Sequence, residues 1–286
     1  MIQVDYGSLL SPEPIPFMLG IKGQKCDIKA PTLRDICKVG FDTFYLFQLY
    51  LKITPEEHFL QYEESTGERK TWDDLTDLDK WNYTMFDCIQ LSPILQNIYS
   101  EVFNFFFTDT VTYQDGLFIV TNCEKVDDEI KPGSVIGVIN HNIFDDLVSI
   151  LQQICCIEPN KKETKPIFKN EKARRNYLKT HKLRKRKKSK IDRDLTIPNI
   201  ISAVATASNN LNMVTIWDLT IFQLFDVFDR LRTFDIYSMN RTSVSVWGEG
   251  DKAKFDNTIW YRNTYDSKSS EPKSDDLSFI HKEENT

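Results

Sequence analysis

Apolar residues recur at helical spacing near the start of the chain, and residues that commonly begin helices precede each run. Thr32-Leu33-Arg34-Asp35 has the form of a capping box, in which a hydroxyl and a carboxylate satisfy backbone N–H groups of the first turn. It predicts a helix from about Leu33 to Lys52. Thr54-Pro55-Glu56-Glu57 predicts a second helix, to about Tyr62, because proline fits the first helical position and acidic side chains complement the helix dipole.

A third helix is expected to begin at Ser92-Pro93. Its apolar residues are spaced so that they share one face, and this face should be part of the core. The residues of the predicted face are Ile94, Leu95, Ile98, Val102 and Phe105.

Between Thr108 and Ile139 the pattern changes to runs of β-branched and aromatic residues. Residues 110–113 and 117–120 flank Gln114-Asp115-Gly116, and Asp-Gly between two such runs predicts a β-hairpin. Residues 134–139 are expected to add a short third strand. Asn142 is then expected to cap a helix that continues through Ile154.

Helical spacing returns in the C-terminal part of the chain. Ile197-Pro198 predicts a helix with an apolar face at residues 200–205. Thr215-Ile216-Trp217-Asp218 has the spacing of another capping box and precedes apolar residues at helical period from Ile221 to Leu231. We expect these two helices to form a hairpin.

The elements together predict a mainly α fold with a small antiparallel β-hairpin or sheet (α+β) and a helical C-terminal hairpin. Only 10 Gly and 11 Pro are present among 286 residues, which is a poor supply of turn residues for an all-β fold. With 41% apolar residues the chain has ample material for a packed interior.

Charge is distributed very unevenly along the chain. Residues 161–193, here called the basic strip, contain 16 Lys and Arg against three acidic residues, while the remaining residues contain 20 basic and 39 acidic side chains. The basic strip therefore carries +13 and the rest −19, within a total of −6. Because so many like charges repel one another, we expect the strip to be a linker or an exposed helix.

This segregation leads to a predicted division of the chain. Residues 1–157 would form a mainly helical domain with a central β-hairpin, and residues 158–194 the basic linker or exposed helix. Residues 195–264 would form the helical C-terminal region. Residues 265–286, which contain almost no apolar side chains, would form a disordered acidic and polar tail.

The densest part of the basic strip is the main candidate for electrostatic binding. Its cations could contact nucleic-acid phosphates and release counterions, or they could bind an acidic protein surface. A solvated insert is the alternative, and aromatic residues that would stack on bases are sparse there. The candidate residues are Lys182, Arg184, Lys185, Arg186, Lys187, Lys188 and Lys190.

Motifs that would indicate catalysis or a bound cofactor are missing from the sequence. Gly248-Glu249-Gly250 lacks the spacing of a phosphate-binding loop, and the four histidines belong to no His-Glu-x-x-His pair. The acidic run at residues 73–79 lacks the glycine and distal glutamate of a calcium loop and is better explained as the acidic first turn of a helix. We therefore predict no catalytic residues, no metal and no cofactor.

Six cysteines are present at positions 26, 37, 88, 123, 155 and 156, without metal-ligand spacing. Residues 1–6 lack the basic and apolar parts of a signal peptide, and the most apolar stretches are too short or too polar to span a bilayer. We therefore expect free thiols, no secretion and no association with membranes.

Several segments resemble tail-assembly proteins, of the chaperone or baseplate type, of tailed phages from Gram-positive hosts. These segments are residues 195–204, 211–212 and 216–226, with shorter ones at 32–36, 40–41 and 245–248. The resemblance implies an assembly chaperone or a tail or baseplate component, with tape-measure or baseplate proteins as partners. It also implies the host cytoplasm as the location, with incorporation into the virion left open. It carries no catalytic residue.

The leading hypothesis is thus a non-enzymatic tail-assembly protein that acts by protein–protein binding. Trp217, Phe222 and Phe225 are its candidate partner contacts, although core packing is the more common reason for aromatic residues at helical spacing. The alternative is an accessory protein that binds nucleic acid through the basic strip.

Overall fold

The computed structural model describes residues 2–20, 24–59, 75–76, 80, 82–126, 129–157, 195–248 and 259–260. Its helices are α1 (Tyr6–Leu10), α2 (Leu33–Val39), α3 (Phe41–Lys52), α6 (Met85–Leu91), α7 (Pro93–Phe106), α8 (His141–Ile154), α10 (Ile197–Ala207) and α11 (Ile221–Trp247), with a 3-10 turn η2 (Ile216–Asp218). Its strands are β1 (Ile15–Met18), β2 (Lys25–Ile28), β3 (Thr110–Gln114), β4 (Leu117–Val126) and β5 (Glu129–Ile139). The predicted mainly α fold with small antiparallel sheets is confirmed.

The larger sheet has the order β3-β4-β5, with all neighbours antiparallel. Asp115 and Gly116 adopt φ angles of 51° and 81°, which is the turn that the Asp-Gly signal predicted. At the outer edge of β3, the Asn104 side chain accepts a hydrogen bond from the Val111 N–H (2.7 Å) and donates one to the Val111 carbonyl (2.8 Å). A side chain of α7 thus occupies hydrogen-bonding groups that an edge strand would leave open.

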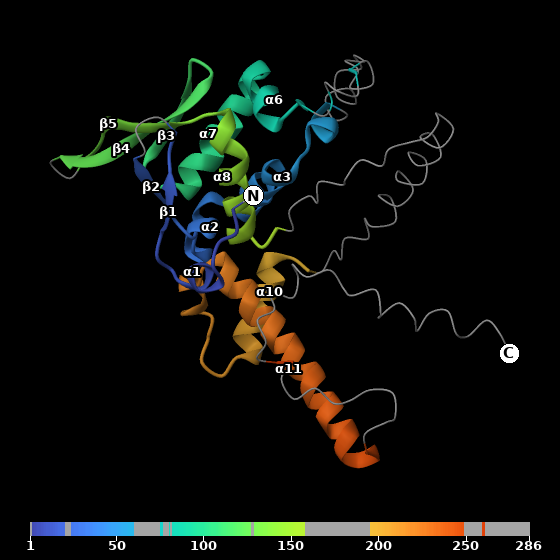
Figure 1. Cartoon of the computed structure of the whole chain (residues 1–286). Helices are drawn as coiled ribbons and strands as arrows, with labels where there is room; N and C mark the ends of the chain where they lie inside the picture. The colour runs from blue at the N-terminus through green and yellow to red at the C-terminus, as the bar shows by residue number, and fades with distance from the viewer. Residues whose placement is uncertain are drawn as a thin grey trace.

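A second sheet, formed by β1 and β2, was not predicted. It lies beside the larger sheet, because Gly20 forms a bridge to Val138 and Ile28 forms one to Phe107. Figure 1 shows both sheets on one side of helices α6, α7 and α8.

Three details of the N-terminal prediction were wrong. The helix expected over residues 33–52 is interrupted at Gly40, whose φ of 91° ends α2 and begins α3. Asn140, not Asn142, caps α8, and its side chain accepts the Asn142 N–H. Ile94, assigned to the core face of α7, is 71% exposed. The other residues assigned to that face are buried or packed against the core.

The C-terminal helices begin as local signals dictate, but one cap was misplaced. Thr196 caps α10, as Ile197-Pro198 indicated. Thr215 makes no side-chain cap and precedes only η2. The capping box that starts α11 is formed by Thr220 and Gln223. The two helices pack against each other, as the hairpin prediction requires.

Aromatic side chains form the centre of the core. Phe103 contacts Phe118 (ring centroids 4.9 Å apart) and Phe144 (6.1 Å), and Phe86 contacts Phe144 (5.3 Å). One hydrophobic cluster extends from Val4 to residues of α10 and α11, so the two predicted folded regions share buried contacts. Their division into domains stays a prediction.

Within the described residues, no helix is long and apolar enough to cross a membrane. Five cysteines are free thiols, as expected: Cys26, Cys37, Cys88, Cys155 and Cys156. The basic strip, the carboxylates of the acidic run at positions 73, 74, 77 and 79, and the predicted C-terminal tail lie outside the described residues.

Candidate partner-binding site

The start of α11 is joined to the N-terminal part of the chain by backbone hydrogen bonds. The Leu33 N–H donates to the Leu219 carbonyl (2.9 Å), and the Ile221 N–H donates to the Pro31 carbonyl (3.0 Å). These bonds accompany an antiparallel bridge between Thr32 and Thr220, whose side chains both serve as helix caps. The bridge between Thr32 and Thr220 thus holds the starts of α2 and α11 together.

A partly buried polar cluster holds the next turns of α11 against α1. The Tyr6 hydroxyl donates to Asp226 Oδ1 (2.7 Å), Arg230 Nε donates to Asp226 Oδ2 (2.8 Å), and Arg230 Nη2 donates to the Tyr6 hydroxyl (2.6 Å). Burial, followed by the bond to Asp226, raises the pKa of Tyr6. The bond to Tyr6 is the main cause that raises the pKa of Arg230. Both side chains are therefore held in their protonated forms.

The three predicted aromatic contacts occupy different environments. Phe222 is only 4% exposed and belongs to the core, where its ring lies edge-on to Tyr6. Phe225 is partly buried and packs against that core. Both placements agree with the alternative of core packing. Trp217, like Phe225, is partly buried and packs against the core, and its remaining surface lines a hollow.

Trp217 lines a shallow hollow of about 310 Å³ together with Arg34, Cys37 and Lys38. The indole N–H of Trp217 donates to the Met213 carbonyl (2.9 Å), which fixes the ring. Arg34 forms an ion pair with Asp218 (2.8 Å). An aromatic wall beside cationic side chains suits a partner side chain that is flat, apolar or acidic.

Beyond Leu231, α11 leaves the body of the molecule. Its first residues, Ile221, Phe222 and Leu224, are buried, whereas residues 234–236 and 239–243 are exposed. Figure 1 shows this end of the helix, coloured orange to red, extending away from the other elements. Residues 232–247, here called the projecting segment, are about 24 Å long at a rise of about 1.5 Å per residue.

One side of the projecting segment is covered by a returning part of the chain. The Trp260 ring lies 5.9 Å from the Phe234 ring and 6.4 Å from the Tyr237 ring, measured between centroids. Three apolar side chains elsewhere on the segment remain strongly exposed: Ile236 (48%), Met239 (65%) and Val246 (65%).

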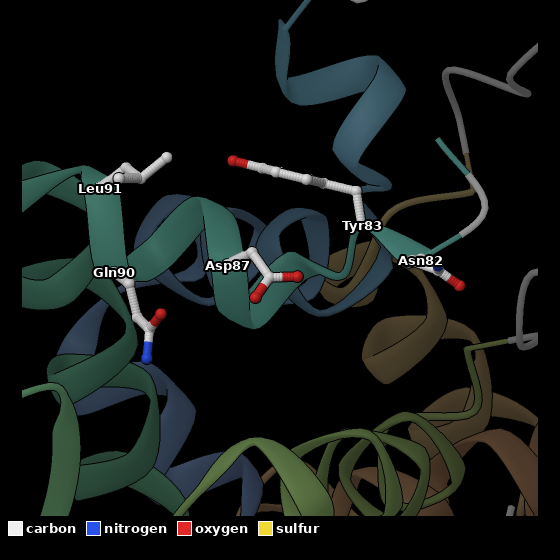
Figure 2. Close-up of a pocket in the computed structure, with 5 residues that line it drawn as sticks. All are labelled: Asn82, Tyr83, Asp87, Gln90 and Leu91. Carbon is white, nitrogen blue, oxygen red and sulfur yellow. The ribbon is translucent and has the colours of Figure 1, made fainter. Parts of the chain in front are cut away.

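A second hollow, of about 350 Å³, lies at α6 and is lined by Asn82, Tyr83, Asp87, Gln90 and Leu91. Figure 2 shows the side chains of Tyr83 and Leu91 pointing toward one another, with Asp87 on the helix between them. The Asp87 carboxylate accepts the Thr84 N–H (2.7 Å) and hydroxyl (2.8 Å), so helix capping accounts for it.

His141 is the titratable neighbour of this hollow. Its Nε2 lies 3.2 Å from the Thr84 hydroxyl and 4.0 Å from Asp87 Oδ1. The arrangement holds the start of α6 beside α8. In the described part of the chain, no group of three or more His, Cys, Asp or Glu side chains is placed to hold a metal ion.

Residues 185–265 match the family described as the YomV second domain. The match indicates a phage-type protein family. It spans less than a third of the chain and includes α10, η2 and α11. No curated protein and no solved structure matches the chain.

The matched residues contain the surface features described above, namely Trp217 and the projecting segment. The cations predicted to bind an acidic partner or nucleic acid, at positions 182, 184–188 and 190, lie partly in the match but outside the described residues. Sequence reasoning missed the projecting segment. The available signal was a second set of apolar residues at helical spacing beyond the apolar pattern of the helix start. In this set Met239 follows Ile236 by three residues, and Val246 follows Met239 by seven.

Proposed function

We propose that this chain is a phage tail-assembly protein that acts by binding other tail proteins and has no catalytic activity of its own. The projecting segment of α11 is the observation that carries this proposal. A helix that leaves the body with apolar side chains exposed is suited to a groove or helix on another protein. The similarity of residues 185–265 to a phage-type family supports the phage setting.

We place two contact surfaces on the partner-binding side. The first is the projecting segment, and the second is the hollow at Trp217, beside the start of the same helix. The partners proposed are tape-measure or baseplate proteins of phages of Gram-positive hosts, met in the host cytoplasm. Retention in the virion would follow if the contact persists in the finished tail.

The experiment is affinity purification of the full chain from cells that produce the phage tail proteins. We expect tape-measure or baseplate proteins to be recovered with the wild-type chain and lost with Met239→Glu or Trp217→Ala. Ser245→Glu is the matched control, because it adds the same charge to the same exposed helix at a polar position. Recovery of no tail protein, or equal recovery with all variants, would contradict the proposal.

The alternative proposal is binding of nucleic acid by the basic strip, and the net charge of +13 over residues 161–193 favours it. Electrophoretic shift assays at increasing salt concentration test it. Neutralising residues 184–188 and 190 should abolish binding to any DNA or RNA sequence. Binding that is absent at low salt would refute this alternative and leave the tail-assembly proposal unaffected.

A further inference from the structure

Three of the exposed apolar residues of the projecting segment, Ile236, Met239 and Val246, lie along one side of the helix. Successive residues of an α-helix are rotated by about 100°, so Ile236, Met239, Ser243 and Val246 lie within one quadrant. Phe234, which contacts Trp260 but is still 47% exposed, lies roughly opposite this quadrant. We call these four residues the α11 stripe.

The α11 stripe is uncharged along its whole length. Between Ile236 and Val246 its members are three apolar residues and one serine, and Arg241, the charged residue in this interval, lies on the other side of the helix. The stripe extends over about 15 Å. A partner surface should therefore be apolar, with a smaller side chain against Met239 and a larger one against Ser243.

We propose that the α11 stripe binds the α11 stripe of a second copy of this chain, with the two helices antiparallel about a two-fold axis. In this register Ile236 packs against Val246 of the second copy, and Met239 packs against Ser243 of the second copy. Each layer then combines a larger with a smaller side chain, as well-packed helix pairs require. The same contacts repeat across the axis, which closes the assembly as a dimer.

A parallel pair fits the same stripe poorly. It would place Met239 against Met239 and Ser243 against Ser243, so that one layer is crowded and the next contains two hydroxyls in an apolar seam. The antiparallel register avoids both mismatches. It is therefore the arrangement that the sequence of the stripe selects.

The shape of the chain also permits the antiparallel pair. In the proposed register the end of α11, at Trp247, lies opposite Asp235 of the second copy. Leu231, where the helix enters the body, then lies beyond the end of the second helix. The two bodies are thus kept at opposite ends of the helix pair (Figure 1).

The inference rests on the proposed function, because it assumes that the projecting segment is a binding element, and the second copy would have to leave the stripe before a tail protein binds there. The stripe covers only about three helical turns and is smaller than the roughly 800 Å² per partner of a standard stable interface. The dimer should consequently be weak and should form with rising concentration.

Analytical ultracentrifugation of the full chain, from about 1 to 500 µM, measures this association over the range expected for a small interface. We expect a shift from monomer to dimer, with Met239→Glu and Val246→Glu weakening the association at least tenfold. Ser245→Glu, on the opposite side of the same turn, should leave it unchanged. A wild-type chain that is monomeric throughout, or a dimer equally sensitive to all three substitutions, would overturn the proposal.

Cysteine pairing tests the direction of the helices. In a background with serine at positions 37, 123 and 156, a mixture of Met239→Cys and Ser243→Cys chains should form disulfide-linked dimers of the two different chains under mild oxidation. Each variant alone should crosslink at least tenfold more slowly, and Arg241→Cys should not crosslink. Fast crosslinking of each variant alone would indicate a parallel pair and overturn the proposed register.

These outcomes can be separated from those of the tail-assembly proposal, because the ultracentrifugation and crosslinking experiments use the purified chain without any tail protein. A monomeric chain that still recovers tail proteins through the α11 stripe would refute self-association and leave the proposed function standing. A dimer that recovers no tail protein would support self-association and contradict the proposed function.

Discussion

Removal of the Asp226 carboxylate should destabilise the chain by detaching the start of α11 from α1. The Asp226 side chain is only 9% exposed and accepts hydrogen bonds from Tyr6 and Arg230. Asp226→Ala breaks both bonds and leaves the Arg230 guanidinium without its counter-charge. Tyr6→Phe removes one hydroxyl but keeps the pair between Asp226 and Arg230.

The magnitude follows from these contacts. Each hydrogen bond to a charged group contributes about 1.5–3 kcal/mol, so two such bonds set an upper limit near 6 kcal/mol. The Arg230 side chain is 33% exposed and would be partly rehydrated in the variant, which lowers the cost. We expect Asp226→Ala to reduce the free energy of unfolding by about 2–4 kcal/mol and Tyr6→Phe to reduce it by about 1–2 kcal/mol.

Urea denaturation of the full chain, followed by circular dichroism, measures these changes. The double variant should lose at least about 0.5 kcal/mol less than the sum of the single variants, because the two side chains share one bond. Asp235→Ala, on the exposed part of the same helix, is the control and should stay within about 0.5 kcal/mol of the wild type. An Asp226→Ala effect no larger than that of the control, or strict additivity of the two losses, would refute the reasoning.

Three further predictions concern the body of the molecule. Asn104→Ala should lower the free energy of unfolding by about 1–3 kcal/mol in urea melts, because it opens two hydrogen bonds at the β3 edge. Gly40→Ala should cost about 1–3 kcal/mol in the same assay, since φ of 91° strains any residue with a Cβ. Burial raises the pKa of Cys26 and of Cys88 to about 12. Burial of these two neutral thiols therefore stabilises the folded chain fully below the thiol pKa of the unfolded chain, about 8.5. This stabilisation decreases as the pH rises toward 12, and urea melts across this pH range measure the decrease. At pH 8 exposed Cys37 should react with a thiol reagent at once, and slow labelling of Cys37 or fast labelling of Cys26 and Cys88 would contradict this prediction.

Elements with a complete local signal could be predicted from the sequence. The capping box at Thr32, Ser92-Pro93 before α7 and Asp115-Gly116 in the hairpin each determine the backbone within a few residues, and the structure has them in place. The break at Gly40 was missed because the apolar pattern continues through it. A glycine within a helical pattern shows its φ angle only in the folded chain.

The smaller sheet and the cap of α11 were missed for another reason. Strands β1 and β2 have four residues each and are paired by tertiary contacts, so their alternation is too short to stand out. Thr215 and Thr220 both precede residues that fit a capping box. The threonine that caps α11, Thr220, also forms a bridge to Thr32. Thr32 lies far away in the sequence, so the local pattern could not show this contact.

The site was only partly predictable. Trp217 was recognised as a candidate contact, but helical spacing could not separate it from Phe222, which the structure places in the core. Whether an aromatic residue on such a pattern is buried depends on which face the rest of the chain covers. The hollow at Trp217 needs Arg34 and Lys38, which come from α2, and no local pattern connects these residues to η2.

The helix propensity of its residues does not by itself explain why the projecting segment is helical. Thr242-Ser243-Val244-Ser245-Val246 contains no strong helix former, and isolated helices shorter than about 12–15 residues are marginal in water even when their residues favour helix. Trp260 covers one side of the segment near Phe234, about three turns before the helix ends. Among the residues that the structure describes, none outside α11 covers Met239 or Val246, which remain 65% exposed, so the described part of the chain gives these last turns little tertiary packing. Contact along the opposite side, at Met239 and Val246, would supply that packing, so the same feature that makes the segment weak alone makes it suited to binding.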